Sequence, residues 1–79
     1  MIIFDDIILR LKEIIATDQN QNKIYNKDVA RALDLTPQYF AVIKKRGKIP
    51  YEAIALFCKK HHISINWILF EQEPKLLSS

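Results

Sequence analysis

Residues 26–43 read NKDVARALDLTPQYFAVI, and this stretch decides the fold. Its apolar residues recur at the three- and four-residue spacing of helices. Asp34 lies at a sharp turn that needs a residue with positive φ, a conformation that Asp tolerates. After the turn, Thr36 is a good helix cap, and Pro37 suits the first helical turn because its missing N–H does no harm there. The stretch therefore predicts two short helices joined as a helix-turn-helix.

The same spacing separates the inner from the outer faces of these two helices. The predicted inner faces carry six apolar residues, Val29, Ala30, Leu33, Leu35, Phe40 and Ile43. The predicted outer faces carry polar and basic residues, Lys27, Arg31, Gln38, Lys44 and Lys45. In a helix-turn-helix unit the second helix is the one presented to a groove.

Helical patterns also flank this stretch. An apolar stripe in residues 4–15 predicts a first helix from residue 5 or 6 to residue 16 or 17. Residues 17–23 are polar and lack periodicity, which predicts a loop. Either Tyr25 or Asn26 is expected to cap the second helix, which ends at Leu33. Gly47 should end the third helix, and Pro50 should occupy the first position of a fourth.

A fifth helix is expected over residues 65–70, capped by Ser64. Beyond it, residues 72–79 contain Pro74 and no helical period, so they are expected to form a flexible tail after a domain spanning residues 1–71. The chain has 79 residues, of which 49% are hydrophobic, with one Gly and three Pro. This composition favours a single small all-α domain over a fold rich in strands and turns.

No sequence feature points to secretion or to a membrane. Cys58 is the only cysteine, so an internal disulfide is excluded. Asp5 and Asp6 interrupt the apolar N-terminus, unlike in a signal peptide, and no uncharged apolar run approaches the roughly 18 residues of a membrane span. We expect a cytoplasmic protein without a membrane partner.

The positive charge is concentrated around the predicted helix-turn-helix. Residues 23–48 contain seven basic and two acidic side chains, whereas the rest of the chain contains five basic and seven acidic ones. This asymmetry favours a polyanionic partner.

Two segments carry a resemblance to a known family. The order VARALDLTPQYFAVIKKRGKIP (29–50), followed by SINWILFE (64–71), resembles the N-terminal DNA-binding domain of phage CI-type repressors. The resemblance implies an all-α, five-helix, lambda-repressor-like fold with helices two and three as the helix-turn-helix. It departs at Asp34, where Gly is usual. A full-length repressor of this kind would continue beyond residue 79, so we expect either a separate DNA-binding domain or a small complete regulator.

The resemblance also implies which residues meet DNA bases. With the third helix in the major groove, the base-reading positions are Gln38, Tyr39, Ala41, Val42 and Lys45. A Gln carboxamide can pair with adenine N6 and N7, Val42 can pack on a thymine methyl, and Lys45 can donate to guanine. The alternative is that Gln38 and Lys45 are ordinary solvated helix residues and that Tyr39 only covers the edge of the core.

A second set of residues is predicted to bind the DNA phosphates. It comprises Asn26, Lys27, Arg31, Thr36, Lys44, Arg46 and Lys48. Those before the turn surround the start of the second helix, where free N–H groups favour anions. The alternative for Lys44 to Arg46 is that they only complement the dipole of the third helix.

The C-terminal segment suggests an interface. Trp67 and Phe70 are large apolar residues on a short terminal helix, and repressors of the resembling family commonly dimerise through this region. A symmetric dimer would read half-sites about 10–10.5 base pairs apart or a multiple of this. The alternative is that Trp67 closes the base of the core.

The sequence offers no pattern for metal, cofactor or catalytic chemistry. Cys58, His61 and His62 lack the further Cys or His that a tetrahedral metal site requires. No nucleophile–base pair or Gly-rich phosphate loop is recognisable, so we expect neither an enzyme nor a cofactor. We therefore predict sequence-specific binding of double-stranded DNA by a phage or prophage-type transcriptional repressor. A protein-interaction adaptor or antitoxin-like module on the same fold, and a non-specific DNA coater, stay open as alternatives.

Overall fold

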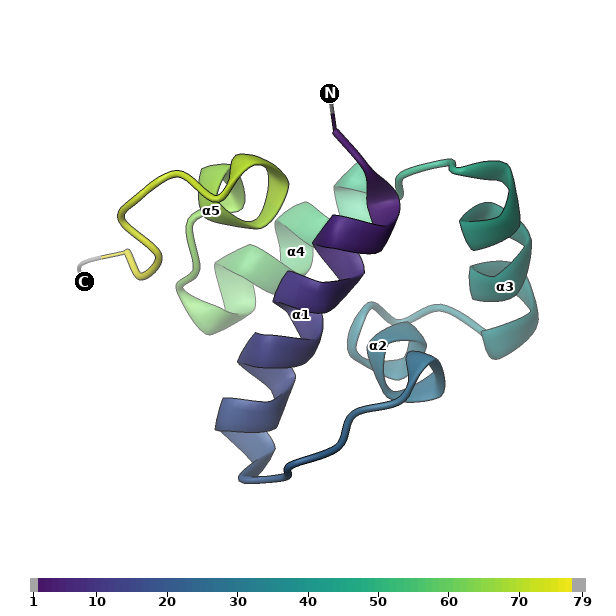
Figure 1. The fold of residues 1–79 in the computed structure, drawn as a ribbon, viewed down its shortest axis with the longest axis horizontal. Coiled ribbons are helices and arrows are strands. Elements are labelled where there is room, and N and C mark those ends of the chain that lie inside the picture. Colours follow the sequence, from purple (N-terminus) through teal and green to yellow (C-terminus); the bar gives the residue numbers. More distant parts are fainter. Residues whose placement is uncertain (1, 78–79) are drawn as a thin grey trace.

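Five helices surround one core in the computed structural model, which describes residues 2–77 (Figure 1). They are α1 (Phe4–Gln19), α2 (Asn26–Ala32), α3 (Pro37–Arg46), α4 (Tyr51–His61) and α5 (Ile65–Phe70). Among the described residues there is no strand, only an isolated bridge between Ile63 and Leu76. The predicted all-α, five-helix fold is confirmed.

Helix α1 forms the centre of the molecule. It crosses the middle of Figure 1, with α5 on one side, α2 and α3 on the other, and α4 behind it. Every residue of its predicted apolar stripe is buried. The helix is longer than predicted, because it starts at the buried Phe4 and ends at Gln19. Asn20 follows as the C-terminal cap with a φ of 53°, and its N–H donates to the Ala16 carbonyl.

The connection between α2 and α3 has the predicted turn. Asp34 has a φ of 60°, and the Leu35 N–H donates to the Ala30 carbonyl at 2.8 Å, which closes the end of α2. Thr36 caps α3 by accepting a hydrogen bond from the Tyr39 N–H at 3.2 Å, and Gly47 ends α3 with φ 68°. Both caps of α3 are therefore as predicted.

The structure shows which residues cap the N-termini of α2 and α4. Tyr25, not Asn26, is the cap of α2, and its N–H donates to the Asp28 carboxylate at 2.8 Å. Pro50 is the cap of α4 and not its first residue, because its ψ of 77° is not helical.

The inner faces of α2 and α3 pack against α1. The predicted core residues Val29, Ala30, Leu33, Phe40 and Ile43 are buried, and Leu35 is partly buried against them. The rings of Phe4 and Phe40 meet edge to face with their centroids 5.8 Å apart. This aromatic contact fixes α3 to the first turn of α1, while the side of α3 opposite to Phe40 and Ile43 is exposed.

The C-terminal segment is held by specific contacts. The Leu77 N–H donates to the His62 carbonyl at 2.8 Å, and the Ser64 N–H donates to the Lys75 carbonyl at 2.9 Å. The Lys75 ammonium also lies 3.4 Å from the Glu13 carboxylate and 4.8 Å from the centroid of the Trp67 ring. Residues 75–77 therefore pair with the α4–α5 connection, and the flexibility expected for residues 72–79 stays a prediction. Residues 78–79 lie outside the described residues.

Candidate nucleic-acid interface

The outer face of α3 is an uninterrupted exposed stripe. Phe40 and Ile43 are buried and fix the direction of the inner face. At about 100° per residue, the positions opposite to them recur at i, i+3, i+4 and i+7. These positions are Gln38, Ala41, Val42 and Lys45, and all four are exposed. We call this set the α3 stripe. Four of the five predicted base-reading residues therefore lie on one line pointing away from the body.

The fifth, Tyr39, lies beside the α3 stripe and not on it. It shares a flank of α3 with Arg46, seven residues further along, and both side chains are exposed. The Tyr39 side chain is therefore placed to reach an edge of any groove that α3 enters. It does not cover the core, because nearly half of its surface, 48%, is exposed.

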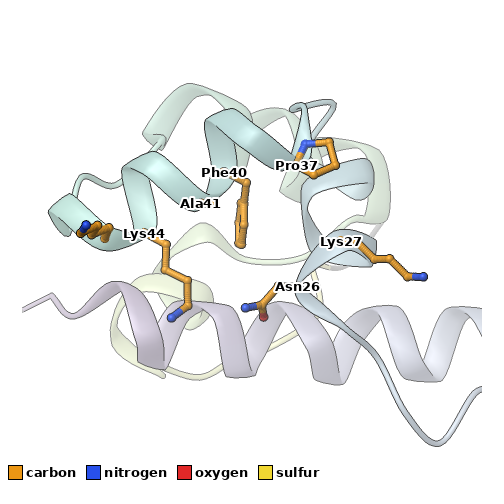
Figure 2. A pocket seen from close by; sticks show the side chains of 7 residues that line it. Asn26, Lys27, Pro37, Phe40, Ala41 and Lys44 are labelled. Carbon is orange, nitrogen blue, oxygen red and sulfur yellow. The ribbon is translucent and has the colours of Figure 1, made fainter.

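A hollow of about 470 Å³ lies on the opposite flank of α3, between that helix and the start of α2. Figure 2 shows Lys44 reaching from α3 toward α1, with the Asn26 side chain turned toward it and Phe40 between them. The hollow is lined by Asn26, Lys27, Pro37, Phe40, Ala41, Lys44 and Lys45. Three predicted phosphate-binding residues from two separate segments, Asn26, Lys27 and Lys44, thus meet in one place.

Lys27 joins this hollow to two others. One lies over the α2–α3 turn, where Lys27, Arg31 and Thr36 are among the lining residues. The other precedes α2 and includes Lys12 and Lys23. Lysine and arginine side chains therefore border the N-terminal part of α3, with the acidic Asp34 among them over the turn. The remaining predicted phosphate-binding residues, Arg46 and Lys48, are exposed at the other end of the helix.

The sequence-based prediction missed part of this surface. The ammonium groups of Lys23 and Lys27 lie 5.4 Å and 5.8 Å from the centroid of the half-exposed Tyr25 ring, at distances typical of cation–π contacts. Ile24, which lies between Lys23 and Tyr25 in the sequence, is buried. A sequence signal did exist: in the extended segment before α2, alternation places Lys23 and Tyr25 on the side opposite to the apolar Ile24.

An acidic residue of α1 forms an ion pair with the basic surface of α3. The Asp5 carboxylate of α1 lies 3.6 Å from the Lys44 ammonium. Helix α3 itself contains no acidic residue, and its last turn is Lys44, Lys45 and Arg46. This face is therefore predominantly cationic. Among the described residues, Lys44–Asp5 is the one ion pair that α3 makes, and Asp34 lines the hollow over the turn.

Cys58 is buried, and this burial raises the pKa of its thiol to about 11. Within residues 2–77, no three His, Cys, Asp or Glu side chains are grouped so that they would hold a metal ion. Over the same residues, none of the helices combines the length and the apolar character needed to span a bilayer.

The two candidate dimer-interface residues differ in their surroundings. Trp67 is only 6% exposed and its ring lies under Lys75, so the alternative that it closes the base of the core is the one observed. Trp67 therefore offers little exposed surface of its own, and its place in a dimer interface stays a prediction. Phe70 is 53% exposed, and dimerisation through it stays a prediction.

Comparison with known protein families identifies the family of this chain. A family model described as the bacteriophage CI repressor helix-turn-helix domain matches residues 6–76. No curated protein and no solved structure matches the chain. Because the family match covers nearly the whole chain, from the first turn of α1 to the paired C-terminal segment, the protein belongs to the bacteriophage CI repressor helix-turn-helix family of DNA-binding regulatory domains.

Proposed function

We propose that the protein binds double-stranded DNA at a specific sequence and represses transcription by occupying a promoter, with α2 and α3 as its helix-turn-helix. The observation that carries this proposal is the α3 stripe, which projects from a helix anchored by Phe40 and Ile43. The major groove of B-form DNA is about 12 Å wide and admits one α-helix. A rigid, exposed helix without acidic residues matches that groove in shape and charge.

The chemistry of the α3 stripe supports base reading. Gln38 is the second residue of α3, and the N-terminal residues of a recognition helix come nearest to the base edges. Its carboxamide can pair with adenine N6 and N7 together. Val42 is 46% exposed and offers an apolar contact for a thymine methyl, while Ala41 is small enough to let the backbone approach. Lys45 supplies a donor for guanine O6 or N7.

Cationic and polar groups border both ends of the α3 stripe. Asn26, Lys27, Arg31 and Thr36 lie beside its N-terminal end, and Arg46 and Lys48 lie beside its C-terminal end. Lys44 lines the hollow on its flank together with Asn26 and Lys27. We propose that these residues bind phosphates on the two sides of the major groove, and that Lys23 and Tyr25 extend this contact along the duplex. Such contacts position a protein on DNA, whereas the base contacts specify the sequence.

Selection from random duplexes tests the proposal. The protein is mixed with a pool of random-sequence duplex DNA, the bound fraction is amplified, and the enriched molecules are sequenced. We expect a short motif of the length that one recognition helix, or two in a dimer, can cover. If the protein binds the pool in a salt-dependent way but no motif is enriched, it would be a non-specific DNA-coating protein instead. Absence of binding even at low salt would overturn the proposal and favour the adaptor alternative.

A further inference from the structure

The first turn of α1 lies beside the part of α3 between Phe40 and Lys44. The Phe4 and Phe40 rings are both buried and pack on each other at 5.8 Å. Asp5 follows Phe4, and Lys44 lies one helical turn after Phe40, so the aromatic contact also brings these two charges together. Their Nζ–Oδ1 distance is 3.6 Å. The core thus fixes the position of an acidic residue next to a helix that otherwise carries only positive charge.

Lys44 belongs to the hollow that also contains Asn26 and Lys27, where the proposed function places a phosphate. Its side chain is 38% exposed and that of Asp5 is 73% exposed, so water reaches both groups. Exposed ion pairs of this kind are weak and exchange readily. A phosphate entering the hollow therefore meets a lysine that is already paired, but only loosely.

We propose that Asp5 competes with the DNA phosphate for Lys44 and so reduces the affinity of the protein for every duplex alike. This inference rests on the proposed function. While Lys44 is paired with Asp5, the two charges cancel, and the lysine contributes little to neutralising the DNA. Because a phosphate contact carries no sequence information, the effect should alter affinity and salt dependence but not base preference.

The neighbouring acidic residues provide controls. Asp6 is the next residue of α1 and is also exposed, but it lines a different hollow, on the α5 side, with Leu9, Arg10 and Trp67. Asp28 lies at the start of α2, and its carboxylate accepts a hydrogen bond from the Tyr25 N–H. Asp6→Asn therefore makes the same change of charge in the same helical turn without releasing Lys44.

The experiment compares the wild type, Asp5→Asn, Asp6→Asn, Lys44→Ala and the Asp5→Asn/Lys44→Ala double variant. Binding to a labelled duplex of arbitrary sequence is followed by fluorescence anisotropy over a range of salt concentrations. One additional phosphate contact steepens the slope of log K against log salt by about 0.9. The affinity advantage of Asp5→Asn over Asp6→Asn should therefore shrink about 3.5-fold between about 50 mM and about 200 mM salt. The double variant should show no advantage over Lys44→Ala beyond that of Asp6→Asn over the wild type.

Three results would overturn the inference. The first is an equal slope for Asp5→Asn and Asp6→Asn, and the second is a gain from Asp5→Asn that persists without Lys44. The third is weaker binding by Asp5→Asn, which would mean that Asp5 orients Lys44 for the phosphate. All three leave wild-type DNA binding intact and so differ from failure of the proposed function, in which the wild type itself does not bind duplex DNA at low salt. Circular dichroism melting of both Asn variants checks that α1 remains folded.

Discussion

Removing the two basic side chains of α2 should weaken DNA binding by a predictable amount. Lys27 borders two hollows beside α3 and a third that precedes α2, and Arg31 lies one turn further along the same exposed face. If each neutralises one phosphate, the Lys27→Ala/Arg31→Ala variant should reduce the slope of log K against log salt by about 1.8, which is twice the value of about 0.9 for one contact. When the salt rises from about 50 mM to about 200 mM, the factor by which the affinity falls should then be about 12 times smaller for the variant than for the wild type.

The matched control removes two charges elsewhere. Lys59 and Lys60 are exposed in the last turn of α4, at the end of that helix away from α3 (Figure 1). The Lys59→Ala/Lys60→Ala variant has the same net charge as the α2 variant, so it measures the long-range effect of charge alone. Fluorescence anisotropy titrations at several salt concentrations give both slopes. If the α4 variant lowered the slope as much as the α2 variant, Lys27 and Arg31 would not be local phosphate contacts.

Three further predictions concern the scaffold. Phe40→Ala should lower the free energy of unfolding by about 3–5 kcal/mol, because it removes the buried contact with Phe4. The control Tyr39→Ala removes an exposed ring and should lower it much less. Both values are measured by urea denaturation, and equal losses would contradict the buried position of Phe40. Ending the chain after Glu71 should uncover the indole of Trp67 and shift its fluorescence to longer wavelength; an unchanged spectrum would mean that the tail does not cover it. Burial raises the pKa of the Cys58 thiol from 9.0 to about 11. The stability that the protonated thiol contributes should therefore be complete below pH 9 and should fall as the pH rises toward 11. The pH dependence of the free energy of unfolding is compared between the wild type and Cys58→Ala, and identical profiles would refute this prediction.

The elements that sequence reasoning located best are those with local signals. Helix α3 begins and ends as predicted, because Thr36, Pro37 and Gly47 act on the backbone within one turn. The outward stripe followed from the helical period once Phe40 and Ile43 were assigned to the core. The positive φ of Asp34 was also a local matter, since the turn admits few other residue types.

The features that escaped sequence reasoning depend on partners far apart in the chain. Arg10 of α1 donates from Nε to the Ile68 carbonyl at 2.6 Å and from Nη2 to the Leu69 carbonyl at 3.1 Å, and no local pattern marks this contact. The tail appears irregular in sequence because its order comes from hydrogen bonds to residues 62–64 and not from a period of its own. The pairing of Lys44 with Asp5 likewise appears only when the Phe4–Phe40 contact brings α1 to α3.

The central claim is that α3 reads bases, and Gln38→Ala tests it most directly. The affinity of this variant is measured for the selected duplex and for a scrambled duplex of the same length, with Gln72→Ala, an exposed residue beyond α5, as the control. We expect Gln38→Ala to lose about 1–3 kcal/mol on the selected duplex, little on the scrambled one, and to relax the preference at one base position. An equal loss on both duplexes would contradict the claim, since Gln38 would then contribute to binding without reading the sequence.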